Sequence, residues 1–159
     1  MVIRPYREAD REALHRITVD CFEQVSVHAI AERLFGRFRG TRWQARKTEN
    51  IDADLLANPT GIFVAVEADQ VLGFVTTRLE PATGIGYVPN IAVAPGHQGL
   101  GLGAALIRTA LDYLAEHGMT HAKIETLVGN AAGEHLYPKM GFREIARQIH
   151  YMMELPRRE

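Results

Sequence analysis

The sequence lacks the features that would cross-link it, anchor it in a membrane or attach it to nucleic acid. Its 159 residues contain one cysteine, Cys21, so no internal disulfide can form, and a single thiol is typical of a reducing cytoplasm. No apolar run approaches the roughly 18 residues of a membrane-spanning helix, and the first residues show no signal-peptide pattern. The formal net charge of −1 argues against a broad nucleic-acid surface. These absences predict a cytoplasmic protein whose partners are neither membranes nor nucleic acids.

Internal repeats, low-complexity segments and metal-binding patterns are also missing. The seven histidines are scattered, and no pair of them has the context of a metal site. A chain of this length can bury a core without disulfides or metal ions. We therefore expect one ordinary domain over residues 1–159, with no bound metal.

The hydrophobic pattern predicts a chain that alternates between strands and helices. Helical spacing predicts helices over about residues 11–21, 27–38, 42–58, 100–117 and 131–140. Strand patterns cover about residues 2–4, 62–80 (two strands around a turn), 85–93, 121–128 and the tail after residue 142. This order predicts an α/β or α+β fold in which helices cover both faces of a sheet. Pro89 cannot donate to a sheet ladder, so it marks a bulge or an edge.

The stretch that points to a ligand is NIAVAPGHQGLGLGAALIRTAL, from Asn90 to Leu111. Three glycines, at 99, 101 and 103, stand between an apolar run and a helical pattern. The amides at a helix N-terminus lack partners and carry about half a positive charge, and a glycine-rich entry lets a phosphate approach them. The pattern therefore indicates a phosphate-binding loop.

Two other interpretations of this loop exist. GLGLGA matches the G-x-G-x-x-A form of the dinucleotide fingerprint, with Glu125 at about the distance expected for a ribose ligand. However, APGHQ separates the strand from the glycines, and the chain offers only one β-α-β unit. The second alternative is a tight turn without a ligand.

The loop resembles the acetyl-CoA loop of the GCN5-related N-acetyltransferase (GNAT) superfamily, in which Gln or Arg is followed by spaced glycines. Gln98, Gly101 and Gly103 fill those places. NAAGEHLYPKMGF, from Asn130 to Phe142, is similar to the family's later motif of Asn, Tyr seven residues on, and Gly-Phe. The resemblance covers roughly residues 62–155, and the two motifs occur in the family's order.

The resemblance implies a mixed, mostly antiparallel sheet with a splayed pair of parallel strands at the cofactor site. The strand at Asn90–Val93 and the strand that carries Glu125 would separate around the pantetheine arm, although Pro89 is also compatible with an ordinary bulge. Acetyl-CoA, as a co-substrate, is then assigned to Ile91, Ala92, Val93, Gln98, Gly99, Leu100, Gly101, Leu102, Gly103, Ala104 and Asn130.

The resemblance also implies an N-acetyltransferase that moves the acetyl group directly to a primary amine in a ternary complex. Tyr137 is the candidate acid, because a tyrosine with a pKa of about 10 keeps its proton at neutral pH and can donate it to a departing thiolate. A packed helix tyrosine is the alternative. Pro138 predicts a kink beside Tyr137, and Gly133 stands where the family often has alanine.

Glu125 is the candidate base, because N-terminal acetyltransferases of this superfamily carry a glutamate five residues before the asparagine. A solvated or salt-bridged strand glutamate is the alternative, and Glu80 or ordered water could serve instead. Cys21 is not the nucleophile in this interpretation, because no base is placed beside it.

RLFGRFRGTRWQARK holds six basic residues between Arg33 and Lys47, interleaved with aromatics. This favours a pair of amphipathic helices with a solvated basic face over a nucleic-acid site. The resemblance places the segment, with His28, beside the substrate cleft, which is compatible with an anionic acceptor. We expect a small-molecule or peptide amine as partner. A non-catalytic acyl-CoA sensor is the rival function, and homodimers are common in the family.

Overall fold

The computed structural model describes residues 1–157, in which the helices follow the predicted order and the predicted strand segments at 62–80 and 85–93 divide into shorter strands. The helices are α1 (Arg11–Phe22), α2 (Val27–Phe35), α3 (Trp43–Ala57), α4 (Leu102–Glu116) and α5 (Ala131–Lys139), with short 3₁₀ turns at Glu8–Asp10 and Pro59–Gly61. The strands are β1 (Val2–Pro5), β2 (Phe63–Glu67), β3 (Gln70–Val75), β4 (Arg78–Glu80), β5 (Ile85–Val88), β6 (Ile91–Val93) and β7 (His121–Ile124).

The sheet consists of two ladders that share two bent segments of chain. One ladder has the antiparallel order β1-β2-β3-β6, and the other has the order β4-β5-β7, in which β5 and β7 are parallel. The chain passes from β3 to β4 and from β5 to β6, so each bent segment belongs to both ladders. The expected mixed, mostly antiparallel sheet is confirmed.

The bend lies at Pro89, where the two ladders join. Asn90 stands opposite Thr76, whose N–H donates to the Asn90 carbonyl at 2.8 Å, and Tyr87 stands opposite Arg78. Two steps separate Thr76 from Arg78 but three separate Tyr87 from Asn90, so the strand that carries Pro89 has one extra residue. The predicted β-bulge is confirmed, and its reason is that proline has no N–H for a regular ladder.

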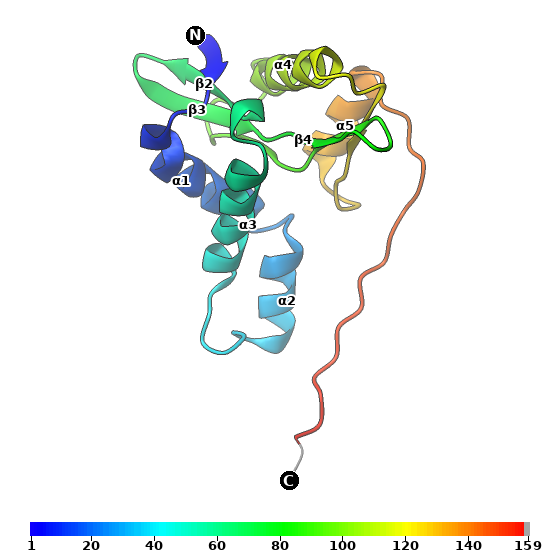
Figure 1. Ribbon diagram of the computed structural model, residues 1–159. Coiled ribbons are helices and arrows are strands. Elements are labelled where there is room, and N and C mark those ends of the chain that lie inside the picture. Colours follow the sequence, from blue (N-terminus) through cyan, green and yellow to red (C-terminus); the bar gives the residue numbers. More distant parts are fainter. Residues whose placement is uncertain (158–159) are drawn as a thin grey trace.

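Helices cover both faces of the four-stranded ladder (Figure 1). On one face, Leu14 of α1 and Ile51 of α3 pack against Val64 and Phe74. On the other face, α4 packs against Ala65, Leu72 and Val75 in a second cluster. Neighbouring strand residues point to opposite faces, which explains why 64 and 65 belong to different clusters. None of the helices in residues 1–157 is both long and apolar enough to cross a membrane.

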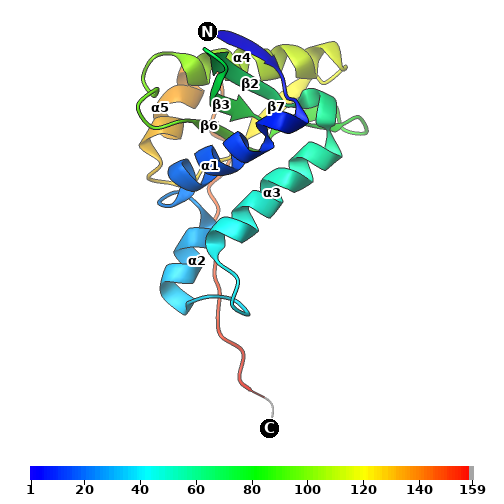
Figure 2. The ribbon, with the colours of Figure 1, turned by 90° about the vertical axis from the view of Figure 1, so that its left-hand side faces the viewer.

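The helix α2 ends earlier than its sequence pattern indicates. It stops at Phe35 because Gly36 adopts a left-handed φ of 77°, which ends the helix three residues before the expected Phe38. The helix α3 then begins at Trp43, close to prediction. The two helices pack side by side and extend beyond the edge of the sheet (Figure 2).

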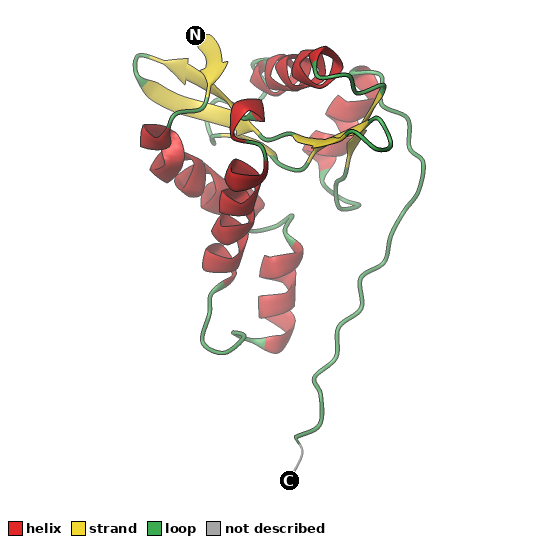
Figure 3. Cartoon of the chain, viewed as in Figure 1, coloured by secondary structure: helices red, strands yellow, loops and turns green. Residues whose placement is uncertain are grey.

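The tail after Gly141 corrects the prediction of a final strand. Residues 142–157 contain no strand, and they run as an extended segment away from the rest of the chain (Figures 1 and 3). A strand needs a neighbouring strand to pair with, and none of the strands pairs with residues 142–157. Its apolar side chains are exposed, at 82% for Ile145 and 89% for Tyr151.

Candidate functional site

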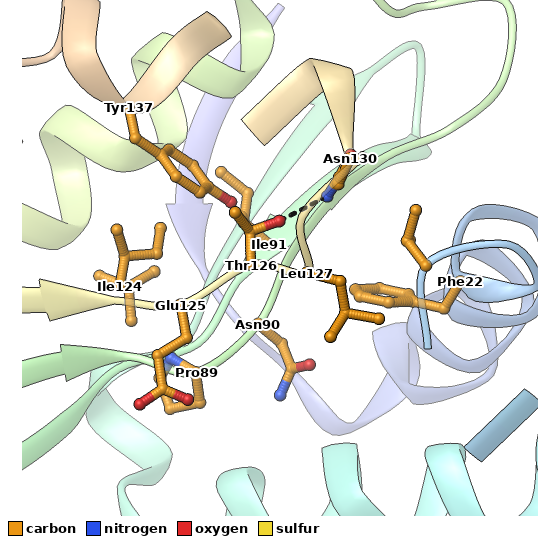
Figure 4. A pocket seen from close by; sticks show the side chains of 12 residues that line it. Phe22, Pro89, Asn90, Ile91, Ile124, Glu125, Thr126, Leu127, Asn130 and Tyr137 are labelled. Atoms are coloured by element: carbon orange, nitrogen blue, oxygen red, sulfur yellow. Dashed lines mark hydrogen bonds between the residues drawn. The ribbon is translucent and has the colours of Figure 1, made fainter. Parts of the chain in front are cut away.

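The candidate site is the gap where two parallel strands separate. The strands β5 and β7 pair from Ile85 and His121 to Val88 and Ile124, and beyond that point the chains diverge. A pocket fills the divergence. Its walls are Val88, Pro89, Asn90 and Ile91 on one side and Ile124, Glu125, Thr126 and Leu127 on the other, with Phe22, Val25, Asn130 and Tyr137 completing it (Figure 4). This is the splayed strand pair that the family resemblance implied.

The β6 wall presents a free backbone edge to this pocket. The carbonyl of Asn90 and the N–H of Ala94 pair with the β3 side, so by the alternation of an antiparallel ladder Ala92 also faces β3. Ile91 and Val93 then direct their N–H and C=O groups away from β3. The Val93 carbonyl accepts hydrogen bonds from Gln98 Nε2 at 2.9 Å and from the Cys21 thiol at 3.2 Å. Of the three predicted backbone contacts, Ile91 and Val93 therefore have the suitable orientation.

The glycine loop leads directly into the N-terminus of α4. Gly99 and Gly101 have left-handed φ values of 78° and 83°, and Gly101 is the N-cap residue. A Cβ built on Gly101 would meet no atom within 4 Å, so the space beside it is open. The amides of residues 102–104 start the helix and have no partner within its first turn. Gly99, Leu100, Gly101, Leu102, Gly103 and Ala104 thus form a continuous, amide-rich entry.

Gly103 has a second role that the sequence did not indicate. A Cβ at this position would lie 3.1 Å from Leu136 Cδ2, which is closer than ordinary van der Waals contact. The missing side chain therefore allows α4 to approach α5. The loop and the helix that carries Tyr137 are thereby held next to each other.

Tyr137 extends from α5 into the pocket, toward Ile91 and Thr126 (Figure 4). The helix continues through Pro138 to Lys139, so the expected kink does not remove the tyrosine from the site. Packing explains why residue 133, one turn earlier in α5, is a glycine. A Cβ there would come within 3.0 Å of both the Tyr137 ring and Thr126 Oγ1. Burial raises the pKa of Tyr137 to about 12.

Asn130 stands at the N-cap position of α5 but does not cap the helix with its side chain. Its Nδ2 donates instead to Thr126 Oγ1 at 2.8 Å, across the mouth of the pocket (Figure 4). The side chain thus ties the start of α5 to the diverging strand. This places Asn130 and Tyr137 on the same wall.

Glu125 lies at the other end of the pocket, next to Pro89 in Figure 4. Its side chain is 74% exposed and accepts a salt bridge from Lys123 Nζ at 2.9 Å. Glu80, the rival base, accepts from Thr83 Oγ1 at 2.7 Å and from the Tyr87 hydroxyl at 3.1 Å, at the far end of β4. Glu125 is therefore the carboxylate that borders the pocket.

A buried polar network beneath the pocket was missed by sequence reasoning. Asp54 of α3 is 1% exposed and accepts hydrogen bonds from Asn90 Nδ2 at 2.7 Å, Thr76 Oγ1 at 2.9 Å and Arg78 at 2.9 Å. Lys47 donates to Asn90 Oδ1 at 2.6 Å. The signal available in the sequence was an aspartate on the apolar face of a helix, between Ile51 and Leu55. The network fixes the Asn90 side of the splay.

Comparisons with known proteins agree with this geometry. Residues 11–142 match the family model described as the acetyltransferase (GNAT) family. The mycothiol acetyltransferase of Tsukamurella paurometabola is 41% identical over 103 residues, which cover 59% of this chain and 35% of that protein. The streptothricin acetyltransferase of Streptomyces lavendulae is 40% identical over 81 residues, covering 50% and 43%. The chain spans less than half the length of these curated relatives.

Solved structures share the fold at low sequence identity. The PaiA N-acetyltransferase of Thermoplasma acidophilum, solved with coenzyme A, has a TM-score of 0.72 at 16% identity, covering 89% of each chain. The ribosomal-protein-S18-alanine N-acetyltransferase of Escherichia coli has a TM-score of 0.65 at 21% identity, covering 91% of this chain and 79% of that one. Together with the family match over most of its length, these likenesses establish that the chain belongs to the acetyltransferase (GNAT) family.

Proposed function

We propose that this protein is an N-acetyltransferase that moves the acetyl group of acetyl-CoA directly to a primary amine. The observation that supports this most is the meeting of two features at one pocket. The backbone edge of Ile91, which faces away from β3, borders one wall, and the Tyr137 side chain enters from the other. The amide-rich entry to α4 adds a site suited to a pyrophosphate.

In this proposal acetyl-CoA supplies the thioester, and the residues of the chain orient it and move protons. Ile91 and Val93 pair with the amides of the pantetheine arm in the manner of a neighbouring strand. Residues 98–104 hold the phosphates, and Asn130 lines the path between them and the pocket. The first-turn amides of α4 add positive potential where the phosphates lie.

Tyr137 completes the transfer as the acid. The amine nitrogen forms a bond to the acetyl carbon, the carbon–sulfur bond breaks, and the Tyr137 hydroxyl gives its proton to the sulfur. Burial raises the pKa of Tyr137 to about 12, so its hydroxyl is protonated at neutral pH and can hydrogen-bond to the sulfur as the thiolate forms. Cys21 is excluded as a covalent carrier, because burial raises the pKa of its thiol to about 11.

Glu125, directly or through water, accepts the proton that the amine loses. A lysine-like amine with a pKa of about 10.4 costs roughly 4–5 kcal/mol to deprotonate at pH 7, whereas an α-amine costs about 1 kcal/mol. An exposed, salt-bridged carboxylate suits the easier of these two tasks. The acceptor is therefore a small-molecule or peptide amine of moderate basicity.

Tyr137→Phe tests the proposal, because it removes one hydroxyl and keeps the ring. We expect kcat to fall by roughly 10²–10⁴ while the affinity for acetyl-CoA hardly changes, since the lost interaction forms mainly in the transition state. Steady-state rates with any turned-over amine, and titration calorimetry with acetyl-CoA, provide the two measurements. Tyr6→Phe, whose hydroxyl donates to Glu8 at 3.0 Å near the N-terminus, is the matched control.

Equal rates for the wild type and Tyr137→Phe would remove this tyrosine from the mechanism. A wild type that binds acetyl-CoA tightly and acetylates no amine would favour the non-catalytic sensor instead.

A further inference from the structure

A lysine without a carboxylate partner lies beside the pocket. Lys47 extends from α3, and its Nζ is 4.4 Å from the centroid of the Phe22 ring and 2.6 Å from Asn90 Oδ1. Phe22 and Asn90 both line the pocket. A further contact, to Asn50 Oδ1 at 3.3 Å, is also neutral, and none of the ion pairs within residues 1–157 involves Lys47.

Among the described residues, the groups around Lys47 offer its ammonium no carboxylate in direct contact. Asp54 lies close enough to act on it through space, but its carboxylate already serves Asn90, Thr76 and Arg78. On α2 and α3, His28 and Arg46 add no negative charge, and Arg46 is itself paired with Glu32 at 3.2 Å. The charge of Lys47 also lowers the pKa of His28, after burial. Within the part of the chain that the structure describes, Lys47 therefore has no anion in direct contact, and the carboxylate of Asp54 acts on it only through space.

Burial of an unpaired ammonium costs free energy, and an arriving anion recovers part of it. The pKa of Lys47 is lowered to about 8, mainly because the group is desolvated. The side-chain amide of Asn90 is fixed in one orientation, because its Nδ2 donates to Asp54 and its Oδ1 accepts from Lys47. Lys47 lies next to the pocket, whereas the phosphates of acetyl-CoA are assigned to residues 98–104. The molecule that can bring an anion to Lys47 is therefore the acceptor.

We propose that Lys47, between Phe22 and Asn90, binds a carboxylate of the acceptor, so that the preferred substrates are amines that also carry a carboxylate. This inference rests on the proposed acetyltransferase function and names its substrate class. Lys47 is then a specificity-determining residue on the acceptor side of the pocket.

Paired acceptors with matched amine basicity test it: glycylglycine against glycylglycinamide, and alanylalanine against its amide. For the wild type we expect kcat/KM at least tenfold higher for the carboxylate member of a pair. Lys47→Met keeps the stem on Phe22, and we expect it to lose that preference, measured as the ratio of kcat/KM within each pair. Lys139→Met, on the exposed end of α5, should keep the preference. A preference unchanged in Lys47→Met, or absent in the wild type, overturns the inference.

A second readout does not require turnover. Carbon-13 NMR of labelled lysines reports the titration of Lys47 against Lys123 and Lys139, the other two lysines of the chain. With acetyl-CoA present, a carboxylate-bearing amine should raise the pKa of Lys47 from about 8 to about 9 or higher, and its amide should not. An unchanged pKa contradicts the inference. A raised pKa without acetylation contradicts only the proposed function.

Discussion

The two walls of the splayed pocket are built very differently. The β6 wall rests on the sheet and on the Asp54 network, so that Asn90 is 4% exposed and hydrogen-bonded on both ends of its amide. The wall formed by the chain after β7 and by α5 is thin. Glu125 is 74% exposed, and α5 buries one residue. The edge proposed to bind the cofactor is thus fixed by the core, whereas the groups proposed to move protons lie on a lightly packed layer.

The difference indicates that the residues that stabilise the fold and the residues proposed to do the chemistry lie on opposite walls of the pocket. A ligand edge that must pair backbone to backbone needs a rigid strand, and a buried network supplies one. The groups proposed to move protons lie on a wall that can adjust its position around an acceptor, because regions with few buried contacts open at low free-energy cost. Substitutions on the two walls should therefore affect different measurements.

The largest expected effect on stability is that of Asp54→Ala. It leaves the buried donors of Asn90 and Thr76 and the Arg78 guanidinium without their acceptor, so we expect a loss of about 3–5 kcal/mol in the free energy of unfolding. Urea unfolding followed by circular dichroism measures it. Asn130→Ala, on the thin wall, is the control and should cost about 1 kcal/mol or less. Similar losses on both walls would contradict the comparison.

A smaller effect, on binding alone, is expected at the loop that follows the rigid wall. Gly101→Val fills open space beside the α4 N-terminus, and its φ of 83° disfavours a side chain. We expect acetyl-CoA affinity to fall at least tenfold, about 1.4 kcal/mol, in titration calorimetry. Gly118→Val is the control for strain, because Gly118 has a φ of 82° and equal space at the far end of α4. Unchanged affinity in Gly101→Val would locate the pyrophosphate elsewhere.

The smallest effect is expected for Glu125→Gln on the thin wall. This carboxylate is exposed and forms a salt bridge with Lys123, so water can replace part of its role as a base. We therefore expect kcat/KM to fall by about three- to tenfold. The acidic limb of the pH–rate profile should disappear with it. Glu80→Gln, outside the pocket, should keep both the rate and that limb. A Glu125→Gln enzyme that also keeps them would leave Glu125 with a structural role only.

Features that depend on a few neighbouring residues were predictable. Gly101 requires a left-handed backbone, Pro89 cannot donate to a ladder, and the Asn130–Phe142 motif begins one helix after the loop. Each leaves a local signature in the sequence. The end of α2 at Gly36 was equally local, but the helical pattern continued past it and hid the stop.

By itself, the sequence determined the approximate positions of the helices and of the loop from Gln98 to Gly103, because each rests on short-range spacing; the roles of Tyr137 and Glu125 come from the family resemblance and stay predictions. Only the tertiary structure decided the rest. Asn90 meets Asp54 and Lys47 across 36 and 43 residues of chain, and the separation of the two walls depends on how two ladders join. The tail also shows that the sequence pattern does not reveal which segments lie side by side. Its alternation predicts a strand, but a strand forms only where another backbone lies beside it.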